Sequence, residues 1–199
     1  MPAPSNPTDS ATLPTTRTPA LRDSPDRYGR ISRCNHWLGA ALVLALLGIG
    51  LYFEDMPRGA DKLYWMKLHI SLGATAFLFL AFRVYWRVSN RVVREFAQPA
   101  ALQWLTRLVH LALLLGITVL ILTGPLAVWS GGRAIEVFGW FTIPGPIGKL
   151  PTLHENLEVA HAVAAKVVLF AVIAHVLGAA KHLLFERERL VGRMIGRGA

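Results

Sequence analysis

Four long apolar stretches constrain this 199-residue chain more than any other feature. They cover residues 36–53, 64–86, 104–129 and 157–185. As helices, stretches of about this length span the ~30 Å hydrocarbon core of a bilayer. Every backbone polar group must be satisfied internally in lipid, so we expect each stretch to be helical. The sequence therefore predicts an all-α integral membrane protein built as a four-helix bundle.

The segments outside these stretches are too short for a separate soluble domain. Residues 1–26 are rich in Pro, Ser, Thr and Ala and contain no apolar run. This composition predicts a disordered tail rather than a secretory signal. The membrane domain is expected over residues 27–195. Within it, Pro125 is expected to kink or end the third helix, and the glycine- and proline-rich loop 130–152 to place its aromatic residues at the membrane interface.

The distribution of positive charge predicts the orientation. The net charge is +9, but the basic residues flank the apolar stretches, which argues against a nucleic-acid partner. The N-terminal approach, the segment between the second and third stretches and the C-terminal tail together hold thirteen arginines. The other two loops hold five Lys and Arg. Both termini are therefore expected on the cytoplasmic side, with lipid around the helices.

Four histidines lie in or beside the fourth stretch, seven or fourteen residues apart: His154, His161, His175 and His182. Seven residues is close to two helical turns, so all four point roughly the same way. Along the helix His161 and His175 are ~21 Å apart. Ionisable groups at membrane depth suggest function, and neutral imidazole is a haem axial ligand. We therefore interpret these two as haem ligands; the alternative is core histidines satisfied by hydrogen bonds.

The expected orientation gives each histidine a depth. His36 and His175 fall near the cytoplasmic face, and His69 and His161 near the outer face. The matching depths predict two haems with bis-histidine ligation of iron, one in each leaflet. The first pair would bind one iron and the second pair the other.

Several further polar residues have more than one reading. Arg83 lies fourteen residues after His69, at the inner haem level, where it could bind propionates or extend to the lipid headgroups. His110 could replace a ligand, contact a propionate or pack between helices. His182 could bind a quinone head group or a propionate, or lie at the surface.

Three other residues receive no functional role. His154 is expected to be solvated at the outer end of the fourth helix, with a ligand role as the alternative. Lys166 lies mid-helix, turned ~140° from His161. Cys34 is the only cysteine, so no internal disulfide can form, and we interpret it as a small buried filler.

Several motifs occur together and in order. They are RxxHW at Arg33 to Trp37, KLHISLG around His69, Arg83 late in the second stretch, LVHLALLLGITVLILTG from Leu108, the spacing of His161, His175 and His182, and LVGRM at Leu190 to Met194. With these motifs, residues 27 to 195 or so resemble the bacterial cytochrome b561 family. That family is related to the b-type subunits of nickel–iron hydrogenases and formate dehydrogenases.

The resemblance implies two haem b groups, ligated by His36 with His175 and by His69 with His161, in a bacterial inner membrane. It implies an electron-transfer oxidoreductase that works with quinone. Some members resemble superoxide:ubiquinone oxidoreductases, which would make the surface near Lys62 and Lys67 attract a small anion and place ubiquinone near His182.

Two other functions are open from the sequence. The chain could anchor a separate hydrogenase or dehydrogenase, as a cytochrome b subunit that passes electrons to or from that redox partner. It could also be a four-helix transporter or metal carrier without haem, although discontinuous helices typical of transporters are not evident.

Overall fold

Four long helices make up almost all of the computed structural model, which describes residues 21–23, 28–90 and 99–184. They are α1 (Arg30–Glu54), α2 (Ala60–Ser89), α3 (Ala100–Ser130) and α4 (Pro151–Leu184). All four are long and apolar enough to cross a membrane. The prediction of a helical membrane bundle is confirmed for this part of the chain. A small hairpin of β1 (Ile135–Val137) and β2 (Phe141–Ile143) was not predicted.

The helices continue beyond the apolar stretches that predict them. α1 begins at Arg30, so His36 lies in its second turn, and α4 begins at Pro151, so His154 lies inside the helix. α3 runs through Pro125 to Ser130 and does not end there. Proline costs one helical hydrogen bond, which spanning helices tolerate when neighbouring groups compensate. Hydrophobicity located the spans but underestimated the helix lengths, because interfacial polar residues remain helical.

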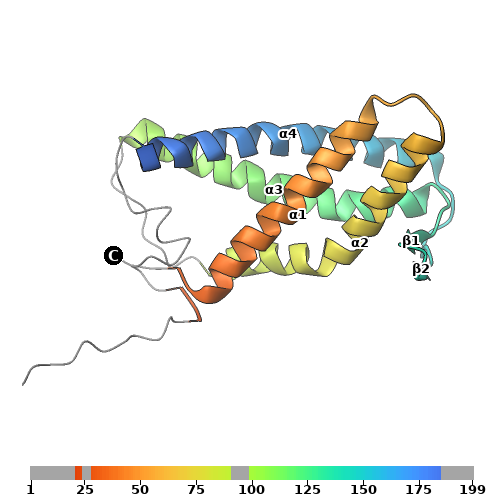
Figure 1. Ribbon diagram of the computed structural model, residues 1–199, viewed down its shortest axis with the longest axis horizontal. Helices are drawn as coiled ribbons and strands as arrows, with labels where there is room; N and C mark the ends of the chain where they lie inside the picture. The colour runs from red at the N-terminus through yellow and green to blue at the C-terminus, as the bar shows by residue number, and fades with distance from the viewer. Residues whose placement is uncertain (1–20, 24–27, 91–98, 185–199) are drawn as a thin grey trace, which may run out of the picture.

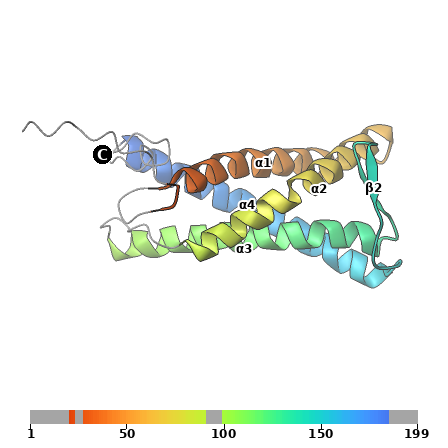
Figure 2. The same cartoon turned by 90° about the horizontal axis from the view of Figure 1, so that it is seen from below.

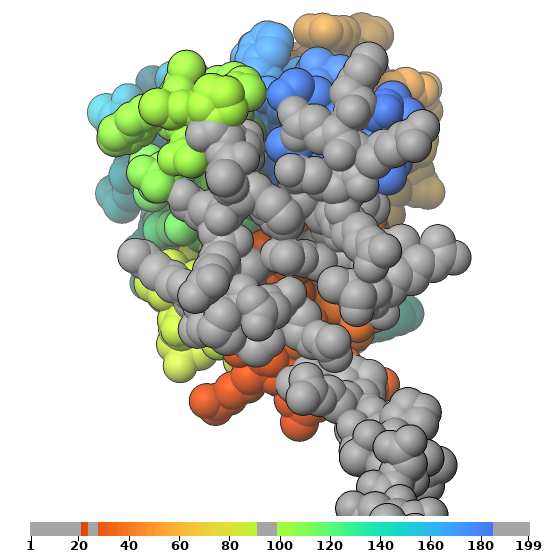
Figure 3. Space-filling model, turned by 90° about the vertical axis from the view of Figure 1, so that its left-hand side faces the viewer, coloured from red at the N-terminus to blue at the C-terminus, as the bar shows by residue number. Residues whose placement is uncertain are grey.

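The helices form two antiparallel pairs. α1 packs on α2, α3 packs extensively on α4, and α2 joins the pairs by contacting α3. The α1–α2 turn and the hairpin lie at one end of the bundle (Figures 1 and 2). The start of α1, the end of α2, the start of α3 and the end of α4 lie at the other. Figure 3 looks onto that second end, where α3 begins beside the last turns of α4.

A narrow apolar core runs along the bundle at mid-length. Its buried members are Val43, Leu47, Ala76, Leu80, Ile117 and Val168, contributed by all four helices. The outward faces are apolar as well: Leu78 is 78% exposed and Phe170 is 69% exposed. Apolar side chains on both the inner and outer faces of a helix are typical of a bundle surrounded by lipid.

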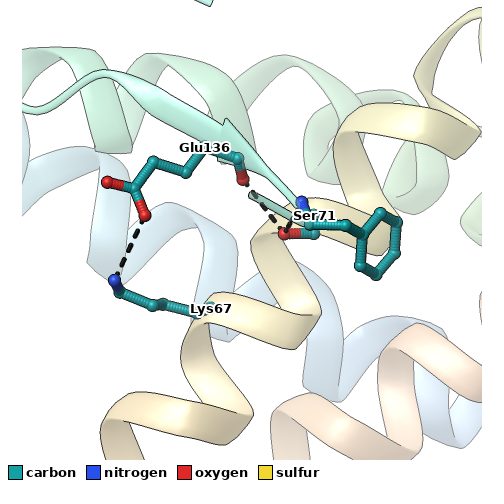
Figure 4. Close-up of polar contacts among 4 residues, drawn as sticks. Lys67, Ser71 and Glu136 are labelled. Atoms are coloured by element: carbon teal, nitrogen blue, oxygen red, sulfur yellow. Dashed lines mark hydrogen bonds and ion pairs between the residues drawn. The ribbon is translucent and has the colours of Figure 1, made fainter. Parts of the chain in front are cut away.

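The hairpin covers the end of the bundle near His69. Val137 is fully buried between α2 and α3, whereas Trp140 is 80% exposed. The Ser71 hydroxyl donates to the Glu136 carbonyl (3.0 Å) and accepts from the Phe138 N–H (3.1 Å), as Figure 4 shows. These two bonds fix the hairpin to α2 two residues after His69.

Parts of the chain with predicted roles lie outside the described residues. These are 1–20 and 24–27 of the expected tail, 91–98 of the basic segment, and 185–199. Residues 21–23 lie against the start of α1: the Asp23 carboxylate accepts hydrogen bonds from the Gly29 N–H (2.7 Å) and the Ser32 hydroxyl (2.8 Å).

Candidate functional site

A seven-residue spacing organises the interior of all four helices into three levels. The middle level is Val43, Ala76, Ile117 and Val168, all buried in the core. Seven residues to one side lie His36, Arg83, His110 and His175, here called the His36 level. Seven residues to the other side lie Gly50, His69, Gly124 and His161, here called the His69 level. Two turns of helix separate neighbouring levels, so an apolar layer divides two polar ones.

At the His69 level, α2 and α4 each contribute one imidazole. The ring centroids of His69 and His161 are 6.2 Å apart, and the ring planes are nearly perpendicular at 82°. Phe53 contacts the His69 ring edge-on, with 5.7 Å between centroids. Both rings therefore face the interior of the bundle, enclosed by apolar side chains.

Glycines on the other two helices leave space at this level. A Cβ at Gly50 would lie 3.4 Å from Cε1 of His69, and one at Gly124 would lie 3.6 Å from Cε1 of His161. A single Cβ would thus touch either ring at ordinary contact distance, and a larger side chain would occupy the space beside it. α1 and α3 contribute backbone here, where α2 and α4 contribute imidazole.

At the His36 level, three imidazoles meet. His36 of α1 and His175 of α4 have ring centroids 6.2 Å apart, the same separation as in the other pair. His110 of α3 contacts His175 on another side, at 5.2 Å. The sequence left His110 with several roles, and the structure places its ring in this cluster.

Arg83 belongs to the His36 level and is partly buried there. Its Nη1 donates to the Asn35 carbonyl at 2.6 Å, on the residue before His36. Its stem lies against Gly39, where an added Cβ would come 2.6 Å from Cδ of Arg83. The guanidinium therefore turns towards α1, beside the residue before His36, rather than out to the headgroups.

Both imidazole pairs fit a haem. The centroid separation of 6.2 Å in both pairs would let both imidazoles of a pair reach one metal at nitrogen–metal distances of ~2 Å. The glycines of the His69 level would leave a flat macrocycle space beside the rings, and Arg83 would offer a cation for propionates at the His36 level. Among the described residues, no group of three or more His, Cys, Asp or Glu could hold a metal ion. The donor set thus suits a bis-imidazole haem better than a many-ligand metal site.

The remaining predicted residues lie elsewhere. His154 is not at a solvated position: its Nδ1 is 2.8 Å from the Ala127 carbonyl, and its Nε2 is 3.3 Å from Glu158. His182 lies in the last turn of α4 and is partly buried. Lys166, which received no role, pairs with Glu54 at 3.1 Å and ties α4 to the end of α1. Cys34 is exposed, so its interpretation as a buried filler is wrong.

The two lysines expected to attract a small anion both have partners. Lys62 Nζ donates to the carbonyls of Glu54 and Met56, each at 3.0 Å, at the end of α1. Lys67 Nζ pairs with the Glu136 carboxylate at 3.1 Å (Figure 4). Their positive charge is partly offset at this surface.

The sequence reasoning missed Thr123, whose hydroxyl lies 2.9 Å from Nδ1 of His161, and the two glycines of the His69 level. The sequence did contain a signal for the two glycines. Gly50 lies fourteen residues after His36, and Gly124 lies fourteen after His110. Extending the seven-residue count from the fourth helix to the other three would have found both.

Comparison with known proteins identifies the family of the chain. The family model described as prokaryotic cytochrome b561 matches residues 27–197. The chain is 29% identical to cytochrome b561 homolog 2 of Escherichia coli K12 over 183 residues, which covers 90% of this chain and 97% of that protein. A family match over most of the length, together with four apolar helices, indicates a multi-pass protein of the bacterial inner membrane that carries b-type haem and transfers electrons. The chain belongs to the prokaryotic cytochrome b561 family.

Proposed function

We propose that this protein is a di-haem cytochrome, in which His36 with His175 and His69 with His161 each ligate one haem b. The observation that carries the proposal is the equal centroid separation of 6.2 Å in two pairs at two separate levels. His110 is 5.2 Å from His175, a shorter separation than the 6.2 Å found in both pairs, so we assign it no ligand role.

Haem supplies one-electron exchange at its iron, and the protein's part is to bind, orient and enclose it. α4 contributes one imidazole to each level, fourteen residues or ~21 Å apart along its axis. The middle level fills the space between with apolar side chains, and Val168 there is fully buried. That layer excludes water between the two sites, and the shared helix fixes their separation.

The excess of arginine beside both termini favours placing the His36 level on the cytoplasmic side. We propose that electrons pass between the two levels and exchange with a quinone near His182. This residue lies seven residues beyond His175, in the last turn of α4, where an imidazole could hydrogen-bond a quinone oxygen. In the His182→Ala protein, quinone reduction should slow while both haems stay bound. An unchanged quinone rate would remove the quinone assignment and favour delivery to a partner dehydrogenase or hydrogenase.

Superoxide as electron donor is a finer form of the same proposal, resting on the family resemblance. The cations near the His69 level support it only weakly, because Lys67 pairs with Glu136 and Lys62 with backbone carbonyls. The deciding measurement is the rate at which superoxide reduces the purified protein in stopped flow. A rate no faster than spontaneous dismutation would exclude this donor.

The haem count of the purified full-length protein tests the central proposal. The reduced-minus-oxidised spectrum should show b-type bands, and the pyridine haemochrome should give two haems per chain. Replacing His36, His69, His161 or His175 singly with alanine should remove one haem each.

His154→Ala is the matched control. It also removes a histidine from α4 at the same seven-residue spacing, but its ring is bonded to Ala127 rather than facing another imidazole. It should retain two haems. Two haems in His175→Ala, or one in His154→Ala, would show that the pairing is wrong.

A further inference from the structure

Thr123 presents a buried hydroxyl to the histidine that we assign to the His69-level haem. The residue is 7% exposed and lies on α3, next to Gly124. Its Oγ1 is 2.9 Å from Nδ1 of His161. A buried polar pair at membrane depth is costly to break, because the alternative is an unsatisfied group in an apolar surrounding.

The hydroxyl has one proton and two close polar neighbours. Oγ1 lies 2.7 Å from the Val119 carbonyl, one turn earlier on α3, and that carbonyl can only accept. With Nε2 of His161 assigned to iron, Nδ1 carries the proton, so the Thr123 hydroxyl would accept from the Nδ1–H and donate to the Val119 carbonyl. The hydrogen bond would then favour the tautomer that leaves the lone pair of Nε2 free to bind a metal.

The register of α3 against α4 maintains this contact. Seven residues further along α4 from His161, Val168 packs on Gly116 of α3, where an added Cβ would lie 2.5 Å from Cγ2 of Val168. Seven residues in the other direction, His154 bonds to the Ala127 carbonyl. Contacts on both sides of His161 thus prevent the two helices from sliding or rotating away from the hydrogen bond.

In the part of the chain that the structure describes, the other proposed ligands have no hydroxyl partner. Within the described segments, no side-chain hydroxyl hydrogen-bonds to the rings of His36, His69 or His175, and the polar group facing the His69 ring is the backbone of Leu46. His161 is therefore set apart from the three imidazoles with which it would share the two irons.

We propose that Thr123 is a positioning residue that orients His161 and lowers the reduction potential of the haem it ligates, an inference that rests on the ligand assignment above. A hydrogen bond from the ligand's second nitrogen makes the imidazole more basic. A more basic ligand stabilises ferric iron more than ferrous iron. Removing the acceptor should therefore favour reduction at this haem and leave the other unchanged.

The test is a potentiometric titration of the purified full-length protein loaded with haem. Thr123→Val keeps the β-branched shape and removes the acceptor. It should shift the reduction equilibrium of one haem by up to about tenfold, which is ~59 mV for one electron, towards a higher potential. Thr123→Ser restores a hydroxyl and should return the potential towards the wild-type value. The single haem left in His161→Ala identifies the other site, which should not move.

Thr118→Val is the matched control, because the Thr118 hydroxyl lies on the same helix and bonds to the Leu114 carbonyl at 2.7 Å, with no hydrogen bond to a histidine in the described structure. An unchanged potential in Thr123→Val, or an equal shift in Thr118→Val, would overturn the inference. If Thr123→Val does not assemble, Thr123→Ala takes its place with the same criteria. Failure of the ligand assignment would show differently, as two retained haems in His161→Ala.

Discussion

The contact between Gly116 and Val168 gives a prediction whose size can be worked out from the structure. A Cβ at Gly116 would lie 2.5 Å from Cγ2 of Val168, and ordinary van der Waals contact begins at 3.4 Å, so Gly116→Ala must open this gap by about 0.9 Å. Val168 is fully buried and β-branched, and in a helix such a side chain has one strongly preferred rotamer. The strain therefore falls on the packing of α3 against α4.

Overpacking of this kind costs about 1–3 kcal/mol, and the better helix propensity of alanine returns about 1 kcal/mol. Gly116→Ala should therefore lower the free energy of unfolding by about 0–2 kcal/mol. In a Val168→Ala background the clash is absent, and the same substitution should be neutral or stabilising. The effect of Gly116→Ala should then differ between the two backgrounds by about 1–3 kcal/mol.

The assay is unfolding in mixed micelles, followed by far-ultraviolet circular dichroism during titration with sodium dodecyl sulfate. Gly178→Ala on α4 is the control, because an added Cβ there meets nothing within 4 Å. It should not destabilise in either background. If Gly116→Ala has the same effect with and without Val168, the reasoning about helix register is refuted.

Three further predictions follow from other contacts. Ser71→Ala leaves two backbone groups of the hairpin without their partner, so unfolding should become easier by about 1–3 kcal/mol, measured in the same titration. Gly50→Leu should fill the space beside His69 and reduce the haem content towards one per chain, whereas Gly48→Leu, where an added Cβ meets nothing within 4 Å, should retain two. Arg83→Gln removes a cation from the His36 level, so the potential of that haem should fall in a redox titration, because less positive charge remains to stabilise the added electron. A rise in that potential would contradict the placement of Arg83.

The sequence alone determined the membrane bundle and the histidine levels. Four apolar stretches required four helices, because lipid cannot satisfy an open backbone. The fourteen-residue spacing from His161 to His175 sets a fixed rise and rotation in any helix through those residues, so the depth of each imidazole could be predicted before any packing was known.

Only the tertiary structure decided which groups surround those imidazoles. The rotation of α3 about its own axis, relative to α4, brings Thr123 to His161 and His110 to His175. That rotation depends on the fit of Val168 against Gly116. His154 has the same spacing as the proposed ligands, yet it bonds to α3, since α4 is longer than its apolar core and its first turns still pack on the end of α3. Periodicity gives the level and side of a residue along its own helix, whereas its partners depend on how side chains of other helices fit together.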